Sequence, residues 1–300
     1  MTASNAFLKK MGFSATDRVV ILHADDIAMC QSTVSAYADM LSFGLISSAA
    51  VMVPCPWFPA AAERIRELAS SEPDVGVHMT LTAEWDAYRW AAVSTADPAT
   101  GLFDPTGYFP HRTDPTRVHA SPDAVALEIR AQLEKALAFG IDVTHIDSHM
   151  LSVFTPAYLP LYLGLAFEHH VPAFALRQDV DELRARGFDE AGAADLVRVT
   201  NEFEERGLPI FDHVYCMSLN TDQGRVAEAT RALAECPPGL THFIVHPASD
   251  TPELQAIAPD WRSRVADRAL FLDETWRSAV AGSGVHVIGY RALRDAIRAD

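Results

Sequence analysis

Acidic and histidine residues recur at the ends of several β-rich runs of the sequence. Two adjacent aspartates follow the first run, and three later runs carry histidines, so that the set comprises Asp25, Asp26, His78, His145, Asp147, His149 and His246. In parallel α/β folds the carboxyl ends of the strands form the active-site face. We therefore expect these side chains to converge on one rim and, as a cluster of ionisable groups, to bind a metal ion.

The residue types favour a catalytic metal site over a structural one. Imidazole nitrogens with one carboxylate suit Zn²⁺ or another transition ion, whereas an all-oxygen shell suits Mg²⁺ or Ca²⁺. Three protein ligands leave a fourth position for water, whose pKa falls from ~15.7 to ~7 on the metal. Of two neighbouring aspartates, one can coordinate while the other accepts the proton. A serine nucleophile is disfavoured because the sequence has no G-x-S-x-G motif.

The elements that must position these residues alternate along the chain. Short β-rich runs are predicted at 19–24, 47–53, 75–81, 143–148, 173–177, 213–219, 241–246 and 285–290. Helical patterns separate them at 34–43, 58–69, 122–139, 156–169, 189–205, 224–235 and 261–281. This alternation predicts an α/β fold with a parallel sheet, in a distorted, TIM-barrel-like (β/α) barrel of seven or eight strands. An open doubly wound sheet is the alternative, although no G-x-G-x-x-G or P-loop follows the first run.

One long stretch, at about 83–120, lacks clear periodicity and is predicted to be a loop insertion in a single domain of residues 1–300. A loop of this length in a compact domain is usually functional, for instance as a lid over a pocket. A surface excursion packed by its own aromatic residues is the alternative. The aromatic residues of the stretch are Trp85, Tyr88, Trp90, Phe103, Tyr108 and Phe109.

The composition excludes several classes of function. The 300-residue chain has 24 Lys and Arg against 40 Asp and Glu, and its formal charge of −16 argues against nucleic acid and anionic membrane surfaces. Hydrophobic residues make up 49%, too many for a disordered chain, yet no apolar run is long enough to span a bilayer. The four cysteines are scattered and no secretory signal is recognisable. We therefore expect a cytoplasmic protein with reduced thiols.

Four blocks of the sequence occur in the order and at the separations typical of a known family. The blocks are His23-Ala-Asp-Asp26, Gly76-Val-His-Met-Thr-Leu-Thr82, Thr144-His-Ile-Asp-Ser-His149 and Val245-His-Pro247. From about residue 18 to 292 the chain resembles the YdjC-like, ChbG/HpnK-type carbohydrate deacetylases, which are relatives of the polysaccharide deacetylases. It departs from them at Ile27-Ala28, where the family often has Phe-Gly, and at Met150-Leu151, where further histidines are common.

The resemblance implies a distorted (β/α) barrel that removes an N-acetyl group from an acetylated amino sugar or related carbohydrate. One divalent metal ion would be bound by Asp26, His78 and His149, with Zn²⁺ favoured by the ligand chemistry and Mg²⁺ or another divalent ion as the alternative. Asp25 would act as general base, and His246 would protonate the departing amine.

Further residues are implied beside the metal or the substrate: Asp147, His145, Arg177, Trp85 and Tyr108. Asp147 would orient a neighbouring histidine or ligand. Arg177 would contact the substrate or a site carboxylate, with a surface ion pair as the alternative.

Two other hypotheses about function remain open from the sequence. The same metal site could hydrolyse another amide or an ester bond, or the protein could be a non-catalytic relative that binds sugar or metal. Retention of Asp25 and His246 argues against the second, because simple binding needs neither a base nor an acid. The expected partner is a small-molecule acetylated carbohydrate, and self-association into a homo-oligomer stays open.

Overall fold

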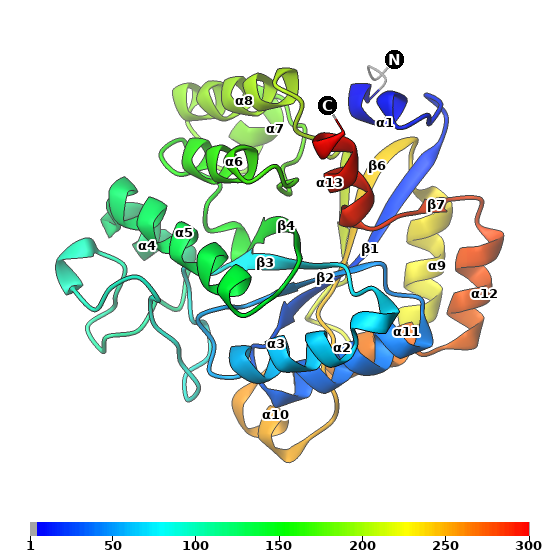
Figure 1. Cartoon of the computed structure of the whole chain (residues 1–300), viewed down its shortest axis with the longest axis horizontal. Helices are drawn as coiled ribbons and strands as arrows, with labels where there is room; N and C mark the ends of the chain where they lie inside the picture. Colours follow the sequence, from blue (N-terminus) through cyan, green and yellow to red (C-terminus); the bar gives the residue numbers. More distant parts are fainter. Residues whose placement is uncertain (1–4, 300) are drawn as a thin grey trace.

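A ring of parallel strands forms the centre of the structure (Figure 1). The computed structural model describes residues 5–299, so residues 1–4 and 300 of the predicted domain lie outside the described residues. The strands follow the order β4-β3-β2-β1-β6-β5, all pairings are parallel, and β7 pairs with β1. Their bounds are β1 Arg18–Ile27, β2 Ser48–Val51, β3 Val75–Met79, β4 Val143–Ser148, β5 His213–Cys216, β6 Gly239–Val245 and β7 His286–Val287.

Irregular segments close the ring between β4 and β5. The Phe174 N–H donates to the carbonyl of Ile146 in β4, and the Arg177 N–H donates to the carbonyl of Phe211, just before β5. Each contact is an isolated parallel bridge rather than a ladder. The fold is therefore a distorted (β/α) barrel, which confirms the fold class predicted from the alternation of strands and helices.

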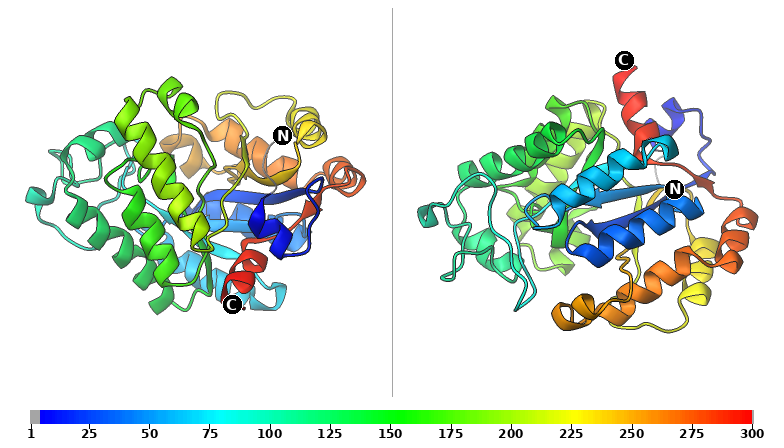
Figure 2. Two further views of the ribbon diagram at one scale, coloured as in Figure 1. Left: turned by 90° about the horizontal axis from the view of Figure 1, so that it is seen from above. Right: turned by 60° about the horizontal axis from the view of Figure 1, so that its bottom comes forward.

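Helices cover the outside of the ring, as the views in Figure 1 and Figure 2 show. Local signals set their ends: the Ser121 side chain accepts the Ala124 N–H at the start of α5, and Gly44 ends α2 in the left-handed conformation (φ 79°). Within residues 5–299, none of the helices combines the length and the apolar character needed to cross a membrane. The helices are α1 Ala6–Lys10, α2 Gln31–Phe43, α3 Phe58–Glu67, α4 Thr113–His119, α5 Pro122–Ala138, α6 Leu159–Glu168, α7 Val180–Ala185, α8 Glu190–Glu205, α9 Arg225–Glu235, α10 Pro252–Ile257, α11 Trp261–Phe271, α12 Glu274–Gly282 and α13 Tyr290–Arg298, with 3₁₀ turns η1 Ala69–Ser71, η2 Pro98–Thr100 and η3 His149–Leu151.

Three predicted elements differ from those in the structure. The strand expected at 173–177 is wrong, because this segment touches β4 at one end and residue 211 at the other without building a ladder with either. The strand expected at 285–290 shrinks to β7, because α13 begins at Tyr290. The helix expected at 261–281 divides into α11 and α12, because the Asp273 side chain accepts the first N–H groups of α12 and so begins a new helix.

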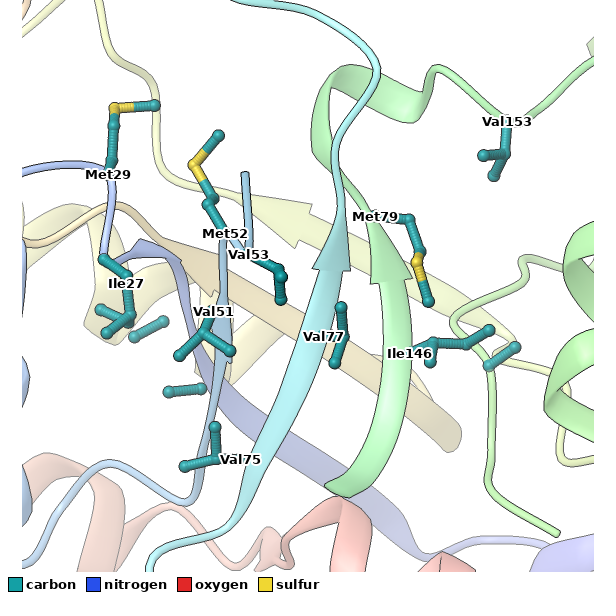
Figure 3. Packing of buried hydrophobic residues seen from close by; sticks show 14 of the residues in the cluster. Ile27, Met29, Val51, Met52, Val53, Val75, Val77, Met79, Ile146 and Val153 are labelled. Carbon is teal, nitrogen blue, oxygen red and sulfur yellow. The ribbon is translucent and has the colours of Figure 1, made fainter. Parts of the chain in front are cut away.

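Strands β1, β2, β3, β4 and β6 are buried almost along their whole length, whereas β5 and β7 are partly exposed. Nine of the ten residues of β1 are buried, as expected for a parallel strand covered on both faces. Figure 3 shows Ile27, Val51, Val77 and Ile146, which come from β1, β2, β3 and β4, in one apolar cluster. This rigid packing fixes the carboxyl ends of the strands relative to one another.

The 83–120 stretch is a packed excursion with little regular structure beyond η2 and α4. Trp90 is 2% exposed, and its indole N–H donates to the carbonyl of Thr82. The buried Glu128 carboxylate in α5 accepts the backbone N–H groups of Val93 and Ser94. These bonds tie the stretch to the barrel, which is the arrangement expected of an aromatic-packed excursion.

Candidate metal centre and active site

A β-bulge turns two consecutive aspartates toward the same side of β1. Side chains of a regular strand alternate between faces, so adjacent residues cannot share one. Between Ala24 and Ile27 the register with β2 gains one residue, and Asp26 adopts a left-handed backbone (φ 63°). Ala28 is also left-handed (φ 75°), a conformation that favours glycine. As a result, both carboxylates lie within 4 Å of the same histidine nitrogen, Nε2 of His78.

Strand alternation places further histidine and aspartate residues on the inner face of β4. His145, Asp147 and His149 are spaced two apart along and just beyond β4, so they share one face. His78 lies opposite Asp147 in the β3–β4 register. All four are buried, with at most 4% of each residue exposed. His78, Asp147 and His149 therefore lie together at the carboxyl ends of β3 and β4, whereas His145, also expected at this rim, lies deeper in the barrel.

Asp26, His78 and His149 form a set of converging donor atoms. Asp26 Oδ1 lies 3.1 Å from His149 Nδ1 and 3.4 Å from His78 Nε2. Neither contact has hydrogen-bond geometry, so this buried oxygen has no hydrogen-bond partner among residues 5–299. One ligand atom from each residue lies within 4.8 Å of the others. One carboxylate oxygen and two ring nitrogens so close together suit a cation, whose binding requires the nitrogens to be deprotonated.

The outward ring nitrogens of both histidines contact further carboxylates. His78 Nδ1 lies 2.6 Å from Asp147 Oδ1, and His149 Nε2 lies 2.9 Å from Glu84 Oε2. A histidine that binds a metal usually donates its other N–H to a carboxylate, which fixes the tautomer and the ring orientation. The two rings are therefore held with their other nitrogens toward Asp26.

A buried arginine holds the second oxygen of Asp26. Arg264 of α11 is 2% exposed, and its Nη1 lies 2.7 Å from Asp26 Oδ2. Trp85 packs over the Arg264 guanidinium at 5.4 Å. Burial by itself raises the pKa of Asp26, but the charges of Arg264 and His149 outweigh it and keep that pKa well below its usual value. Asp26 is thus ionised. Its Oδ2 pairs with Arg264, and its Oδ1 has no hydrogen-bond partner among residues 5–299.

Asp25 lies beside this set among three histidines. Its Oδ1 is 3.0 Å from His23 Nε2, and its Oδ2 is 3.8 Å from His78 Nε2 and 3.7 Å from His246 Nε2. Burial raises the pKa of Asp25, but the neighbouring charge of His78 and the His23 contact lower it overall. Burial lowers the pKa of His246, against the pull of Asp26 and Asp25. At neutral pH the pair therefore consists of a carboxylate and a neutral imidazole.

Below the rim, buried aromatic rings form the floor of the barrel. The His145 ring stacks on Tyr290 at 3.7 Å, and His23 contacts His242 edge to face at 4.6 Å. His23 bridges the two aspartates at its sides, because its Nε2 also lies 2.9 Å from Asp147 Oδ2. Burial alone would lower the pKa of His23, but Asp147 and Asp25 raise it to about 9.

The chain is similar in sequence to proteins of a known family. The family model described as YdjC-like protein matches residues 19–282. A carbohydrate deacetylase of Thermus thermophilus is 30% identical over 97% of this chain and 98% of its own. The chain belongs to the YdjC-like family.

Other YdjC-like and related proteins agree over the same length. A carbohydrate deacetylase of Thermoanaerobacter pseudethanolicus is 22% identical over 92% of this chain and all of its own. A crystal structure from Enterococcus faecalis V583, provisionally described as a cellobiose-phosphate cleavage protein, superposes with a TM-score of 0.72 at 19% identity. It covers 93% of this chain and 99% of its own. That structure supports the barrel fold.

Two predicted site residues of this YdjC-like protein lie apart from the cluster. Arg177 pairs with Glu204 at 2.6 Å through both of its terminal nitrogens and with Asp212 at 3.2 Å, the ion pair expected as its alternative. Tyr108 is 40% exposed and contacts Arg89. The structure thus brings Trp85, but not Tyr108, against the Arg264 that pairs with Asp26.

Sequence reasoning missed several residues around the candidate site, namely His23, Glu84, His242, Arg264 and Asp267. Alternation offered a signal for two of them, because His23 precedes Asp25 by two positions and His242 precedes His246 by four. Glu84 reaches the site from a loop and Arg264 from an outer helix. In neither place does the local sequence pattern indicate a role in the site. Asp267 accepts the backbone N–H of His246 and so holds the end of β6.

Proposed function

We propose that this YdjC-like protein is a metal-dependent hydrolase that removes the N-acetyl group of an acetylated amino sugar or related carbohydrate. The proposal rests on the position of Asp26 Oδ1, which faces one nitrogen of His78 and one of His149. The other nitrogen of each ring contacts a carboxylate, Asp147 for His78 and Glu84 for His149. The names of the relatives supply the acetylated carbohydrate.

The residues present fit one divalent cation. Asp25, Asp26 and Asp147 place three carboxylates in a buried site, where Arg264 pairs with Asp26 and His23 bridges Asp25 and Asp147. A cation bound at Asp26 would take the place of protons on the facing nitrogens of His78 and His149. Two imidazoles and one carboxylate favour Zn²⁺, while Mg²⁺ or another divalent ion stays an alternative. The ion would act as a Lewis acid on the acetyl carbonyl and would make a water molecule acidic at neutral pH.

The chain's own residues then move the proton. Asp25 is ionised beside the metal set and would accept a proton from the attacking water. His246 is neutral, and we infer that it receives this proton across the 3.7 Å between its Nε2 and Asp25 Oδ2. It would then pass the proton to the amine nitrogen as the C–N bond breaks. The products are acetate and a free amino sugar, so the proton taken from water is the one gained by the amine.

Replacing Asp25 by asparagine separates binding from turnover. We expect Asp25→Asn to keep near-stoichiometric metal and to lose ~10²–10⁴-fold in acetate release, because the amide cannot accept a proton. His78→Ala and His149→Ala should lose the metal in elemental analysis. Asp39→Asn, at an exposed ion pair with Arg268, is the matched control.

Two outcomes would contradict the proposal. Metal retained in both histidine variants would refute the ligand set, and full turnover by Asp25→Asn would refute its role as base. Circular dichroism of each variant checks that the barrel is folded before either result is interpreted.

A further inference from the structure

The packed excursion that follows β3 reaches the proposed metal set through two adjacent residues. Glu84 Oε2 lies 2.9 Å from His149 Nε2, in hydrogen-bond geometry. Trp85 is 2% exposed and packs over the guanidinium of Arg264, which in turn pairs with Asp26. Two of the three proposed ligands are therefore supported from one segment of the chain.

This segment lies behind the ligands and not over the space in front of them. A cavity of about 450 Å³ opens at Asp25, His78 and His246, and none of the residues 83–112 lines it. A lid would contact the space that it covers. The contacts of residues 83–112 with the site are instead contacts with the proposed ligand His149 and with the arginine that pairs with Asp26.

A chain of hydrogen bonds inside the excursion fixes the backbone of Glu84. Arg89 Nη1 donates to His111 Nε2 at 2.9 Å, so the proton of this imidazole lies on Nδ1. His111 Nδ1 then donates to the carbonyl of Glu84 at 3.2 Å. Arg89 also donates to Asp104 at 2.8 Å and to the carbonyl of Phe109 at 2.6 Å. These bonds anchor the backbone from which the Glu84 carboxylate extends.

A carboxylate behind a metal-binding histidine determines which ring nitrogen meets the metal. Glu84 accepts the Nε2–H of His149, which leaves Nδ1, 3.1 Å from Asp26 Oδ1, as the nitrogen that gives up its proton when a metal binds. Loss of such a partner typically weakens metal binding by about 10–100-fold. The excursion therefore holds a group on which the affinity for the metal depends.

We propose that residues 83–112 form a clasp for the metal site, in which Glu84 is a positioning residue for His149 and His111 acts on the metal through Glu84. The inference rests on the proposed metal set. Binding free energies are reciprocal, so a clasp that strengthens metal binding is itself stabilised by the metal.

The zinc affinity of Glu84 variants tests the positioning role. Metal-free protein would be titrated with Zn²⁺ in competition with a chelator of known affinity. Glu84→Ala should bind Zn²⁺ about 10–100-fold more weakly, whereas Glu84→Gln should lose less, because its amide oxygen can still accept the N–H of His149. Asp86→Ala, at a fully exposed side chain of the same segment, is the control and should bind Zn²⁺ as the wild type does.

A second measurement separates positioning from a general loss of stability. Urea unfolding of the metal-free proteins would be compared with their zinc affinities. If Glu84→Ala lowered the unfolding free energy but bound Zn²⁺ as tightly as the wild type, the inference would be overturned. The visible spectrum of bound Co²⁺ should also change in Glu84→Ala, because it reports the arrangement of the ligands.

A distant variant tests the hydrogen-bond chain. His111→Ala removes the donor to the Glu84 carbonyl without touching a proposed ligand, and it should weaken Zn²⁺ binding at least about threefold. His119→Ala, at an exposed histidine of α4, is the matched control. Because His111 acts through Glu84, adding His111→Ala to Glu84→Ala should cause no further loss. Additive losses would overturn this part of the inference.

Hydrogen exchange measures the reciprocal effect. Zn²⁺ should slow amide exchange in residues 83–112 of the wild type, and much less so in Glu84→Ala at saturating metal. Equal slowing in the two proteins would overturn the clasp while the wild type still binds Zn²⁺. Failure of the proposed metal centre has a different result, because the wild type would then bind no Zn²⁺ in the same titration.

Discussion

Asp25 and Asp26 are chemically identical neighbours whose surroundings give them different tasks. Asp26 has one oxygen committed to Arg264 and the other free among histidine nitrogens. Asp25 lies against His23 and His246 and lines the cavity. Burial raises the pKa of both carboxyls, but the neighbouring charges outweigh it and lower both pKa values overall. Arg264 is therefore the residue that most directly controls the proposed ligand.

Arg264→Met tests this control. Removing the guanidinium leaves the buried Asp26 Oδ2 without its ion-pair partner, so the metal-free variant should lose about 3–5 kcal/mol of unfolding free energy. Added Zn²⁺ neutralises the same charge and should therefore raise the midpoint of urea unfolding more in the variant than in the wild type. Arg268→Met, on the same helix at an exposed ion pair with Asp39, is the control. A metal-free variant as stable as the wild type would contradict the role of Arg264.

At the scale of elements, alternation was predictable from the sequence because it depends on local patterns. Period-2 spacing placed His145, Asp147 and His149 on one face, and strand–helix alternation gave the barrel. The strand predicted at 173–177 was wrong, because a short apolar run does not reveal whether neighbouring segments form continuous strand pairings with it. Arg264 could not be predicted, because a lone arginine in an amphipathic helix is ordinary until Asp26, 238 positions away, is brought against it.

Gly76 shows how closely two of these elements approach. A Cβ on this β3 residue would overlap the buried His145 ring of β4, which is itself held by stacking on Tyr290. Gly76→Ala should therefore lower the unfolding free energy by about 1–3 kcal/mol in urea denaturation. Gly164→Ala, in α6 with no atom near its added methyl, should instead stabilise by about 0.5–1 kcal/mol. Equal effects of the two substitutions would show that the β3–β4 contact is looser than described.

At the scale of the whole molecule, the buried histidine floor couples folding to pH. Burial, helped by the charge of His23, lowers the pKa of His242 from 6.5 to about 3. Below pH ~6.5 the unfolded chain takes up a proton at this residue and the folded chain does not, so stability is lost as the pH falls from 6.5 toward 3. The contribution is about 1.4 kcal/mol per pH unit.

His242→Phe removes this titration and suits the neighbouring rings of Phe174 and Phe211. A plot of unfolding free energy against pH between 4 and 6 should be shallower for the variant by about 1.4 kcal/mol per unit. His286→Phe, at a half-exposed histidine, is the control. Parallel plots for His242→Phe and the wild type would mean that the folded protein accepts the proton.

The central place of β1 in the barrel sets the order of events during synthesis. Residues Arg18 to Ala24 pair one by one with Gly239 to Val245, about 220 positions later, and Val19 also pairs with His286. At roughly 5–20 residues per second a ribosome needs about 10–45 s to make the intervening chain. Throughout that interval the emerging β1 presents an apolar edge with no partner on one side. The nascent chain is therefore most in need of protection by chaperones until β6 has left the ribosome.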